Sequence, residues 1–248
     1  MNETLIRIKD VKKTYAPSES APVSALNGVT LDIKRGEFVA LTGASGSGKS
    51  TLLNLIGLLD TPTSGEIIVN GKDISRFSEK ESNLFRLQTV GFVFQFFNLV
   101  ENYTALENIM FQLELQGKNR HDIRKKSLEI LSYLNLTNRA DLYPKNLSGG
   151  EQQRVAIGRA LAKESDLILA DEPTAHLDSK NSQMVMDVLH HVNKTFGRTI
   201  ILVTHEPTQA EQADVRVIMQ DGRVQKAERL DVSPTDEVRY TKGENTEK

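Results

Sequence analysis

The stretch EFVALTGASGSGKSTLLNLIGLL, residues 37–59, joins an apolar segment, a glycine-rich loop and a helix-like segment in direct succession. Residues 37–42 are apolar enough for a strand that is buried on both faces, and residues 49–59 have helical length and spacing. The loop between them, GASGSGKST, fits the pattern G-x-x-x-x-G-K-[ST]. A strand, this loop and a helix in that order predict a phosphate-binding loop within a mixed α/β fold.

Each part of this loop has a chemical purpose. Glycines let backbone N–H groups turn inward around phosphates, and the N-terminus of the following helix adds positive potential. Lys49 is expected to reach the β- and γ-phosphates, and Ser50 can ligate Mg²⁺. With strand, spacing and lysine all present, a glycine-serine turn before an ordinary helix is the weaker interpretation. The residues predicted to bind the nucleotide here are Gly43, Ala44, Ser45, Gly46, Ser47, Gly48, Lys49, Ser50 and Thr51.

Strand and helix patterns alternate along the rest of the chain. Strand patterns cover residues 5–11, 29–34, 90–95, 166–173 and 198–205, and hairpins are predicted at Asn70-Gly71 and Asp221-Gly222. A helical pattern over 182–196 lies between the last two single strands, which is the alternation typical of a parallel sheet with crossover helices. Strand signals are missing from about Asn98 to Lys145, where helical patterns indicate an inserted lobe.

Composition excludes several classes of protein. The 248 residues carry a net charge of −2, which argues against a surface bound throughout to nucleic acid or anionic lipid. The absence of cysteine excludes disulfides, thiolate catalysis and cysteine-ligated metal clusters. No segment approaches the roughly 20 apolar residues of a membrane span, and the start MNETLIRIKD does not resemble a signal peptide. We therefore expect a soluble, cytoplasmic chain.

Two strands end in residues suited to hydrolysis at the γ-phosphate of a nucleotide. LILADEP ends in Asp171 and Glu172, whose side chains point to opposite sides, so Asp171 can face the Mg²⁺ while Glu172 holds or deprotonates the attacking water. An isolated Asp-Glu pair would more often be a solvated turn. ILVTHE ends in His205, which would lie on the same carboxyl edge if the strands are parallel. Its predicted role is a hydrogen bond to the γ-phosphate or to Glu172 and the water.

Two further side chains are candidates with weaker signals. Gln95, which ends VGFVFQ, offers an amide that can contact both a metal ion and water. Tyr15 could stack on adenine, although a half-exposed strand tyrosine is the ordinary interpretation. The other histidines, His121, His190 and His191, are interpreted as structural or surface residues.

The segment LSGGEQQR, residues 147–154, has adjacent glycines at the start of a predicted helix but lacks a lysine. Taken with the preceding motifs in this order, and with AHLD at 175–178, it makes the chain resemble the ATP-binding cassette (ABC) ATPases of transporters from about Leu5 to Val224. The resemblance implies a P-loop NTPase (RecA-like) core with an antiparallel β subdomain and an inserted α-helical subdomain. The implied ranges are 1–95 and 146–225 for the core and β lobe, 96–145 for the helical subdomain and 226–248 for a polar C-terminal tail that forms little fixed structure.

The resemblance also explains the missing lysine. In this family two cassettes pack head to tail. Each ATP lies between the phosphate loop of one subunit and the signature of the other, and in this chain the signature is LSGGEQQR. It implies that Ser148, Gly149 and Gly150 contact the γ-phosphate bound to a partner chain, and that Asp178 makes a cross-subunit contact. The implied ligands are ATP and Mg²⁺, the latter held by Ser50, Gln95 and Asp171, and the implied ATP-bound state is a homodimer.

Within the family, residues 23–66 and 91–109 look most like the lipoprotein-release, macrolide-export and bacitracin-resistance group, with the cell-division type left open. This implies an integral membrane permease with a large extracytoplasmic domain as partner, received around residues 96–143, and a cassette on the inner face of the cell membrane. FQFFNLV could contact that partner or form the lobe's own core. A soluble ATPase acting on nucleic acid or ribosomes and a non-hydrolysing regulatory cassette are the alternatives. His176 departs from the family pattern, which commonly has a small residue or asparagine there.

Overall fold

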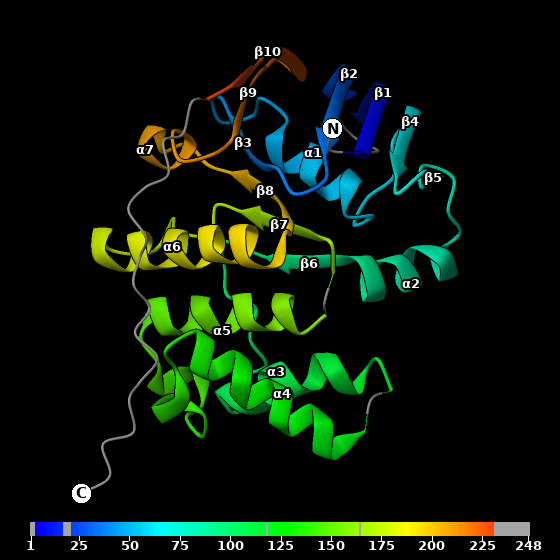
Figure 1. The fold of residues 1–248 in the computed structure, drawn as a ribbon. Helices are drawn as coiled ribbons and strands as arrows, with labels where there is room; N and C mark the ends of the chain where they lie inside the picture. Colours follow the sequence, from blue (N-terminus) through cyan, green and yellow to red (C-terminus); the bar gives the residue numbers. More distant parts are fainter. Residues whose placement is uncertain (1–2, 17–20, 118, 164, 231–248) are drawn as a thin grey trace, which may run out of the picture.

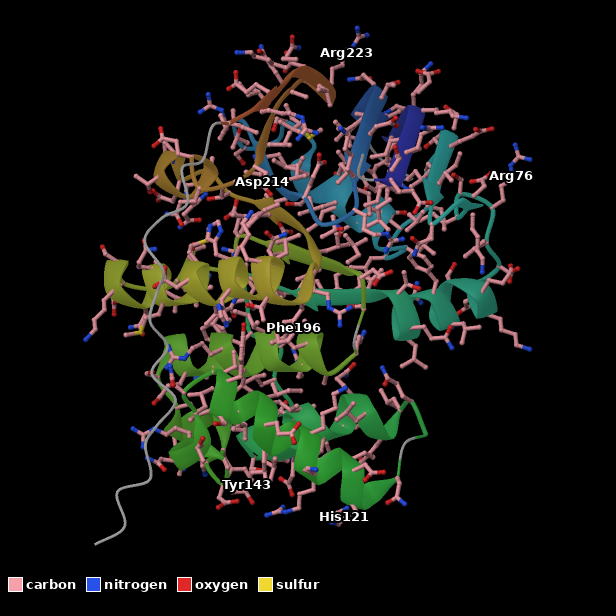
Figure 2. All side chains as sticks on the ribbon, in the orientation of Figure 1. Arg76, His121, Tyr143, Phe196, Asp214 and Arg223 are labelled. Atoms are coloured by element: carbon pink, nitrogen blue, oxygen red, sulfur yellow. The ribbon has the colours of Figure 1, made fainter. Side chains whose placement is uncertain are left out.

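The computed structural model describes residues 3–16, 21–117, 119–163 and 165–230. They form two β-sheets and a layer of helices, which lies below the strands in Figure 1. The predicted tail at 231–248 lies outside the described residues. Figure 2 shows Tyr143 and His121 on the helical layer, at the opposite end of the molecule from Arg223.

The larger sheet has the strand order β10-β9-β3-β8-β7-β6. All neighbours in it pair in parallel except β9 and β10, which form a hairpin. The predicted parallel arrangement is therefore confirmed, and the strand before the phosphate loop lies next to the strand that leads to His205. The strands are β3 (Phe38–Thr42), β6 (Val90–Val93), β7 (Leu167–Asp171), β8 (Thr199–Val203), β9 (Val215–Gln220) and β10 (Arg223–Arg229).

The central strands are apolar throughout because both faces of this sheet are covered. In β8, Ile200 and Leu202 belong to one buried cluster, whereas Ile201 and Val203 belong to a second cluster on the other face. Helix α1 (Lys49–Ile56) contributes to the second cluster, together with the smaller sheet. Helices α5 (Gly149–Ala162) and α6 (Ser179–Phe196) contribute to the first cluster. The sheet thus separates two hydrophobic cores.

The smaller sheet is antiparallel, with the order β2-β1-β4-β5. Its tight turn between β4 and β5 falls at Asn70-Gly71, where φ is 50° and 74°, so the predicted hairpin is confirmed. The strands are β1 (Thr4–Tyr15), β2 (Val23–Lys34), β4 (Ser64–Val69) and β5 (Lys72–Asp73).

The described residues between β6 and β7 form helices joined by loops and no strand, as the sequence predicts. Helices α3 and α4 pack on α5, which in turn packs on α6, so α5 joins the helical layer to the sheet (Figure 1). The remaining helices are α2 (Glu79–Thr89), α3 (Ala105–Glu114), α4 (Arg120–Tyr133), α7 (Pro207–Ala210) and two 3₁₀ turns at Thr137–Arg139 and Pro144–Asn146.

The clearest differences from the sequence predictions are α2 and the end of β10. Helix α2 was not predicted because it is polar, although Ser78 and Glu81 form a capping box that marks its start. Strand β10 continues to Arg229, so the boundary predicted after residue 225 lies inside a strand. Ion pairs explain this extension of a polar segment: Arg216 of β9 bonds Glu228, and Arg229 bonds Glu37.

Candidate active site

The phosphate loop lies between the end of β3 and the start of α1. Lys49 is buried, and its Nζ donates hydrogen bonds at 2.9 Å to the carbonyl oxygens of Gly43 and Ala44. The ammonium group is therefore held inside the loop that it is expected to serve. Gly48 stands at the N-cap of α1 and has no side chain that could accept from the first N–H groups of the helix, which leaves them for an anion.

Glycine is required at two positions of this loop. Gly43 and Gly48 have φ angles of 140° and 100°, which L side chains rarely adopt. A Cβ on Gly43 would lie 2.1 Å from the carbonyl oxygen of Met219, and one on Gly48 would lie 2.7 Å from that of Ala25. The loop therefore packs backbone against backbone, which fixes its shape before any ligand binds.

The acid at the end of β7 reaches this loop. The Ser50 hydroxyl donates to Asp171 Oδ1 at 3.0 Å across 121 residues of sequence. Burial raises the pKa of Asp171, repulsion from Glu172 adds to the rise, and the bond from Ser50 and the charge of Lys49 oppose it. Burial disfavours the ionised form of such a carboxylate, and a nearby cation stabilises that form.

The Ser50 and Asp171 pair fits Mg²⁺, because both groups offer oxygen donors, the ligands this ion prefers. Among the described residues, no group of three or more His, Asp or Glu side chains could hold a metal ion. A magnesium ion here would therefore need phosphate oxygens and water to complete its shell, which is the usual arrangement for Mg²⁺ at nucleotides.

Glu172 and His205 lie together at the carboxyl edge of the parallel strands. His205 Nδ1 is 3.5 Å from Glu172 Oε1, and the Glu172 amide donates to the carbonyl oxygen of Val203 at 3.0 Å. Glu172 has a φ of 43°, a left-handed conformation that is uncommon for a residue with a side chain. Such strain occurs where surrounding structure holds a functional side chain in place. The predicted proximity of these two side chains is present in the structure.

Gln95 lies next to His176 rather than at the oxygen pair. The Gln95 amide nitrogen is 3.2 Å from His176 Nε2, and the His176 ring packs on Phe96 with ring centroids 5.1 Å apart. Within the described part of the chain, no hydrogen bond joins Gln95 to Ser50 or Asp171. A role for Gln95 as a metal ligand stays a prediction, and His176 gains a structural connection that the sequence did not indicate.

Tyr15 stands at the end of β1, and 40% of its surface is exposed. Its hydroxyl donates to Asp60 Oδ2 at 2.8 Å, and Lys13 Nζ lies 4.8 Å from the ring centroid. Burial and the hydrogen bond with Asp60 raise the pKa of Tyr15, whereas a hydrogen bond with Thr51 opposes the rise. The hydrogen bond with Thr51 places the Tyr15 side chain beside the phosphate loop, and its role as an adenine platform stays a prediction.

The signature segment starts α5 with a complete N-terminal cap. The Ser148 hydroxyl accepts from the Glu151 amide, and the Glu151 carboxylate accepts from the Ser148 amide at 2.8 Å. Arg139 Nε also donates to Glu151 at 2.8 Å. Burial would raise the pKa of Glu151, but the bonds from Arg139 and Ser148 outweigh it and lower that pKa. Glu151 therefore fixes the start of α5 as an anion.

Gly150 brings the signature against the segment AHLD. A Cβ on Gly150 would lie 2.3 Å from Oδ1 of Asn181, whose side chain donates to Asp178 Oδ2 at 2.7 Å. Asp178 also caps α6 by accepting from the Asn181 amide at 2.8 Å. Asn181 and Arg139 were missed by sequence reasoning, because nothing in their local sequence shows which helix they face.

The phosphate loop and the signature lie on opposite faces of the larger sheet. Helix α1 belongs to one buried core and contacts β2, β7 and β8, whereas α5 belongs to the other core and contacts α3, α4, α6 and β6 (Figure 1). The starts of α1 and α5 are thus anchored in two different cores, one on each face of the sheet.

A groove of about 1160 Å³ opens between the end of β6 and the helical layer. Phe96, with 67% of its surface exposed, and Tyr143, with 42%, offer apolar surface there, and His176 lines the same groove. The prediction that FQFFNLV provides a contact surface fits this exposure, while Leu99 from the same stretch packs against the core. Within the described ranges, no helix is long and apolar enough to span a membrane.

Known proteins with similar sequences match most of this chain. The ABC transporter family model matches residues 26–175. The lipoprotein-releasing system ATP-binding protein LolD of Aquifex aeolicus is 44% identical over 220 residues, which cover 89% of this chain and 96% of that protein. The macrolide export ATP-binding/permease protein MacB of Chlorobaculum tepidum is 48% identical over 220 residues. This chain spans only 33% of the length of that MacB protein.

Comparison with solved structures gives the same result as comparison with known sequences. The dimeric structure of MJ0796, an ABC transporter cassette of Methanocaldococcus jannaschii, is 42% identical and has a TM-score of 0.85, covering 92% of this chain and all of that one. A dimeric post-hydrolysis state of the same cassette, bound to ADP and Pi, gives a TM-score of 0.84 at 41% identity. The resemblance drawn from the motifs is thereby confirmed, and the chain belongs to the ABC transporter family as an ATP-binding cassette.

Proposed function

We propose that this chain is the ATP-hydrolysing subunit of a transporter or mechanotransmission complex. It pairs with a second copy around ATP and drives a separate membrane permease. The observation that carries this proposal is the separation of the two phosphate-binding elements on opposite faces of one sheet. A second chain, packed head to tail, supplies the missing half of each site.

Nucleotide binding uses the phosphate loop and Tyr15. Lys49 exchanges its bonds to Gly43 and Ala44 for the β- and γ-phosphate oxygens, and the free N–H groups at the start of α1 add further donors. Mg²⁺ held by Ser50 and Asp171 would neutralise part of the phosphate charge. The exposed face of Tyr15 stacks on the adenine ring.

Hydrolysis uses the pair at the ends of β7 and β8. The Glu172 carboxylate holds the attacking water by accepting its hydrogen bond, and it takes up the proton as the new P–O bond forms. His205 lies within 3.5 Å of Glu172 and donates to the γ-phosphate or to the same water. The P–O bond to ADP breaks as phosphate leaves. A regulatory cassette without turnover would not require these two side chains to meet.

The signature and Asp178 act across the dimer. Ser148 and Gly150, at the N-terminus of α5, direct N–H groups and a hydroxyl at the γ-phosphate bound by the partner. The solved dimers of MJ0796 support this arrangement. Because ATP bridges the two chains, its hydrolysis weakens their association, which shifts the complex between closed and open states.

The membrane partner docks in the groove beside Phe96 and Tyr143. This groove offers an exposed aromatic surface, and Gln95, which is predicted to contact the metal and the water, lines the same groove. The names of the LolD and MacB relatives support lipoprotein release or macrolide export as the class of transport. The proposed permease has a large extracytoplasmic domain, and the cassette lies on the inner face of the cell membrane. Nucleic acid is not a proposed partner.

The variant Glu172→Gln tests the catalytic part. An amide cannot accept the proton of the attacking water, so phosphate release should fall by about 100-fold or more while ATP binding persists. The unhydrolysed ATP should then trap a dimer that size-exclusion chromatography with light scattering detects. A Glu172→Gln variant that stays monomeric in saturating ATP would contradict the shared site.

The variant Ser148→Arg tests the shared site from the other side. In the Glu172→Gln background it should abolish the ATP-dependent dimer, because a long cation replaces the capping hydroxyl at the start of α5. ATP binding by the monomer should remain, since the phosphate loop lies on the other face of the sheet. Equal loss of ATP binding would instead indicate a general defect in folding.

A further inference from the structure

A buried glutamine joins the two loops that carry Glu172 and His205. Gln209, in the short helix α7, accepts a hydrogen bond from the Thr204 hydroxyl at 2.8 Å through Oε1. Its Nε2 donates to the Thr174 hydroxyl at 2.8 Å. Thr204, Thr174 and Gln209 are exposed by only 2%, 7% and 7%. The three side chains are therefore largely shielded from solvent, and each bond has a defined geometry.

The two threonines lie beside the proposed catalytic side chains in sequence. Thr204 directly precedes His205, and its hydroxyl also accepts from the Glu206 amide at 3.0 Å. Thr174 follows Glu172 by two residues. The Gln209 amide therefore spans the gap between the loop after β7 and the loop after β8.

The backbone bond from the Glu172 amide to the Val203 carbonyl oxygen holds the two loops together at the strand ends, but not beyond them. A cavity of about 430 Å³ opens between them, and Glu172, Thr174, Thr204, His205 and Gln209 are among the residues that line it. The left-handed backbone of Glu172, with φ of 43°, must also be held by its surroundings. The bridge through Gln209 provides a buried restraint on the open side of both loops.

We propose that Gln209 is a positioning residue for ATP hydrolysis, which holds the His205 loop against the Glu172 loop so that the imidazole meets the carboxylate. This inference rests on the proposed function of those two residues. Gln209 itself touches no reacting atom and acts through His205. Its loss lets the His205 loop move away from the Glu172 loop, and a misplacement on the order of 1 Å lowers turnover, whereas nucleotide binding by Lys49 does not use the bridge.

The first test is Gln209→Met, which keeps the length of the side chain and removes both hydrogen-bonding groups. We expect kcat for ATP to fall by about 10-fold or more, with KM changed by less than about 2-fold. Gln212→Met is the matched control, because Gln212 is half-buried three residues later and donates to the Thr208 carbonyl oxygen outside the bridge. It should keep the original kcat.

A double variant separates positioning from general destabilisation. In the His205→Ala background, Gln209→Met should lower the rate by less than about 2-fold, because the residue acts through His205. Single-turnover conversion of radiolabelled ATP resolves such slow rates. If the Gln209→Met chain fails to fold, Thr174→Val removes one bond of the bridge and should lower kcat by about 3-fold or more at unchanged KM.

The outcomes distinguish the two proposals. If His205→Ala hydrolyses ATP at the original rate, the proposed catalytic pair is wrong. If His205→Ala is impaired while Gln209→Met and Thr174→Val keep the original kcat, the positioning role is wrong and the catalytic pair stands. A loss from Gln209→Met that is equally large with and without His205 also overturns the positioning role.

Discussion

The side-chain nitrogen of Gln95 lies 3.2 Å from Nε2 of His176, although the two residues are separated by 81 positions. This contact joins the end of β6 to the segment AHLD after β7. An amide nitrogen donates, so the bond requires that the His176 Nε2 carries no proton. His176 therefore holds the one glutamine that was predicted to reach the metal and the water.

Removal of this contact should free Gln95 for the nucleotide site. We expect His176→Ala to lower the KM for Mg·ATP by up to about 5-fold, because a hydrogen bond worth about 1 kcal/mol no longer competes. Steady-state phosphate release measures this value, and His121→Ala, on the exposed surface of α4, is the control. An unchanged KM would show that the bond does not restrain Gln95.

Asp171→Asn should stabilise the chain without nucleotide while impairing its use of magnesium. The folded chain has a raised pKa at Asp171, so it binds that proton more tightly than the unfolded chain, and stability falls as pH rises through the interval between the two pKa values. At pH values above this interval, Asp171→Asn removes the free-energy cost of burying a charged carboxylate. We expect Tm at pH 7 to rise by about 1–3 °C.

This gain in Tm should disappear below about pH 4, where the carboxyl is protonated in both states. The exposed Asp141, changed to asparagine, is the control and should show no such gain. Calorimetric titration measures the affinity for ATP with and without Mg²⁺. Mg²⁺ should raise the affinity of the original chain, and EDTA should remove this effect. The affinity of Asp171→Asn should change with neither addition. A lower Tm for Asp171→Asn at pH 7 would contradict the account of its pKa.

Phe96→Ser should weaken the association with the membrane permease. The change removes the most exposed aromatic side chain of the groove, and an aromatic anchor at an interface is commonly worth about 2 kcal/mol, or roughly 30-fold in affinity. Co-purification of the tagged chain from solubilised membranes measures the loss. Leu115→Ser, an exposed apolar residue outside the groove, is the matched control and should co-purify normally.

Gly150→Ala should destabilise the start of α5, and Gly149→Ala should cost much less. A Cβ on Gly150 would overlap the Asn181 side chain at 2.3 Å, whereas one on Gly149 would meet Leu177 at 3.3 Å. We expect a loss of about 1–3 kcal/mol in the free energy of unfolding for Gly150→Ala. Adding Asn181→Ala removes the two closest atoms and should restore part of it, as urea unfolding can measure.

The order of motifs was sufficient to predict the parallel sheet, the phosphate loop and the approach of His205 to Glu172. These features depend on local rules: apolar runs form buried strands, and the carboxyl ends of parallel strands meet at one edge. The helical lobe between β6 and β7 was predicted on the same basis. The polar helix α2 and the extension of β10 were missed, because capping and ion pairs rather than apolar periodicity form them.

The sequence by itself thus determined the family, the chemistry of each loop and the presence of a phosphate-binding signature without a lysine. Only the tertiary structure decided the other contacts between loops. No local pattern encodes the contacts between segments that are far apart or differently oriented. These contacts are Gln95 with His176, Gly150 with Asn181, and Gln209 with both threonines. The structure also placed α1 and α5 on opposite faces of the sheet, because each helix buries its apolar side against a different core.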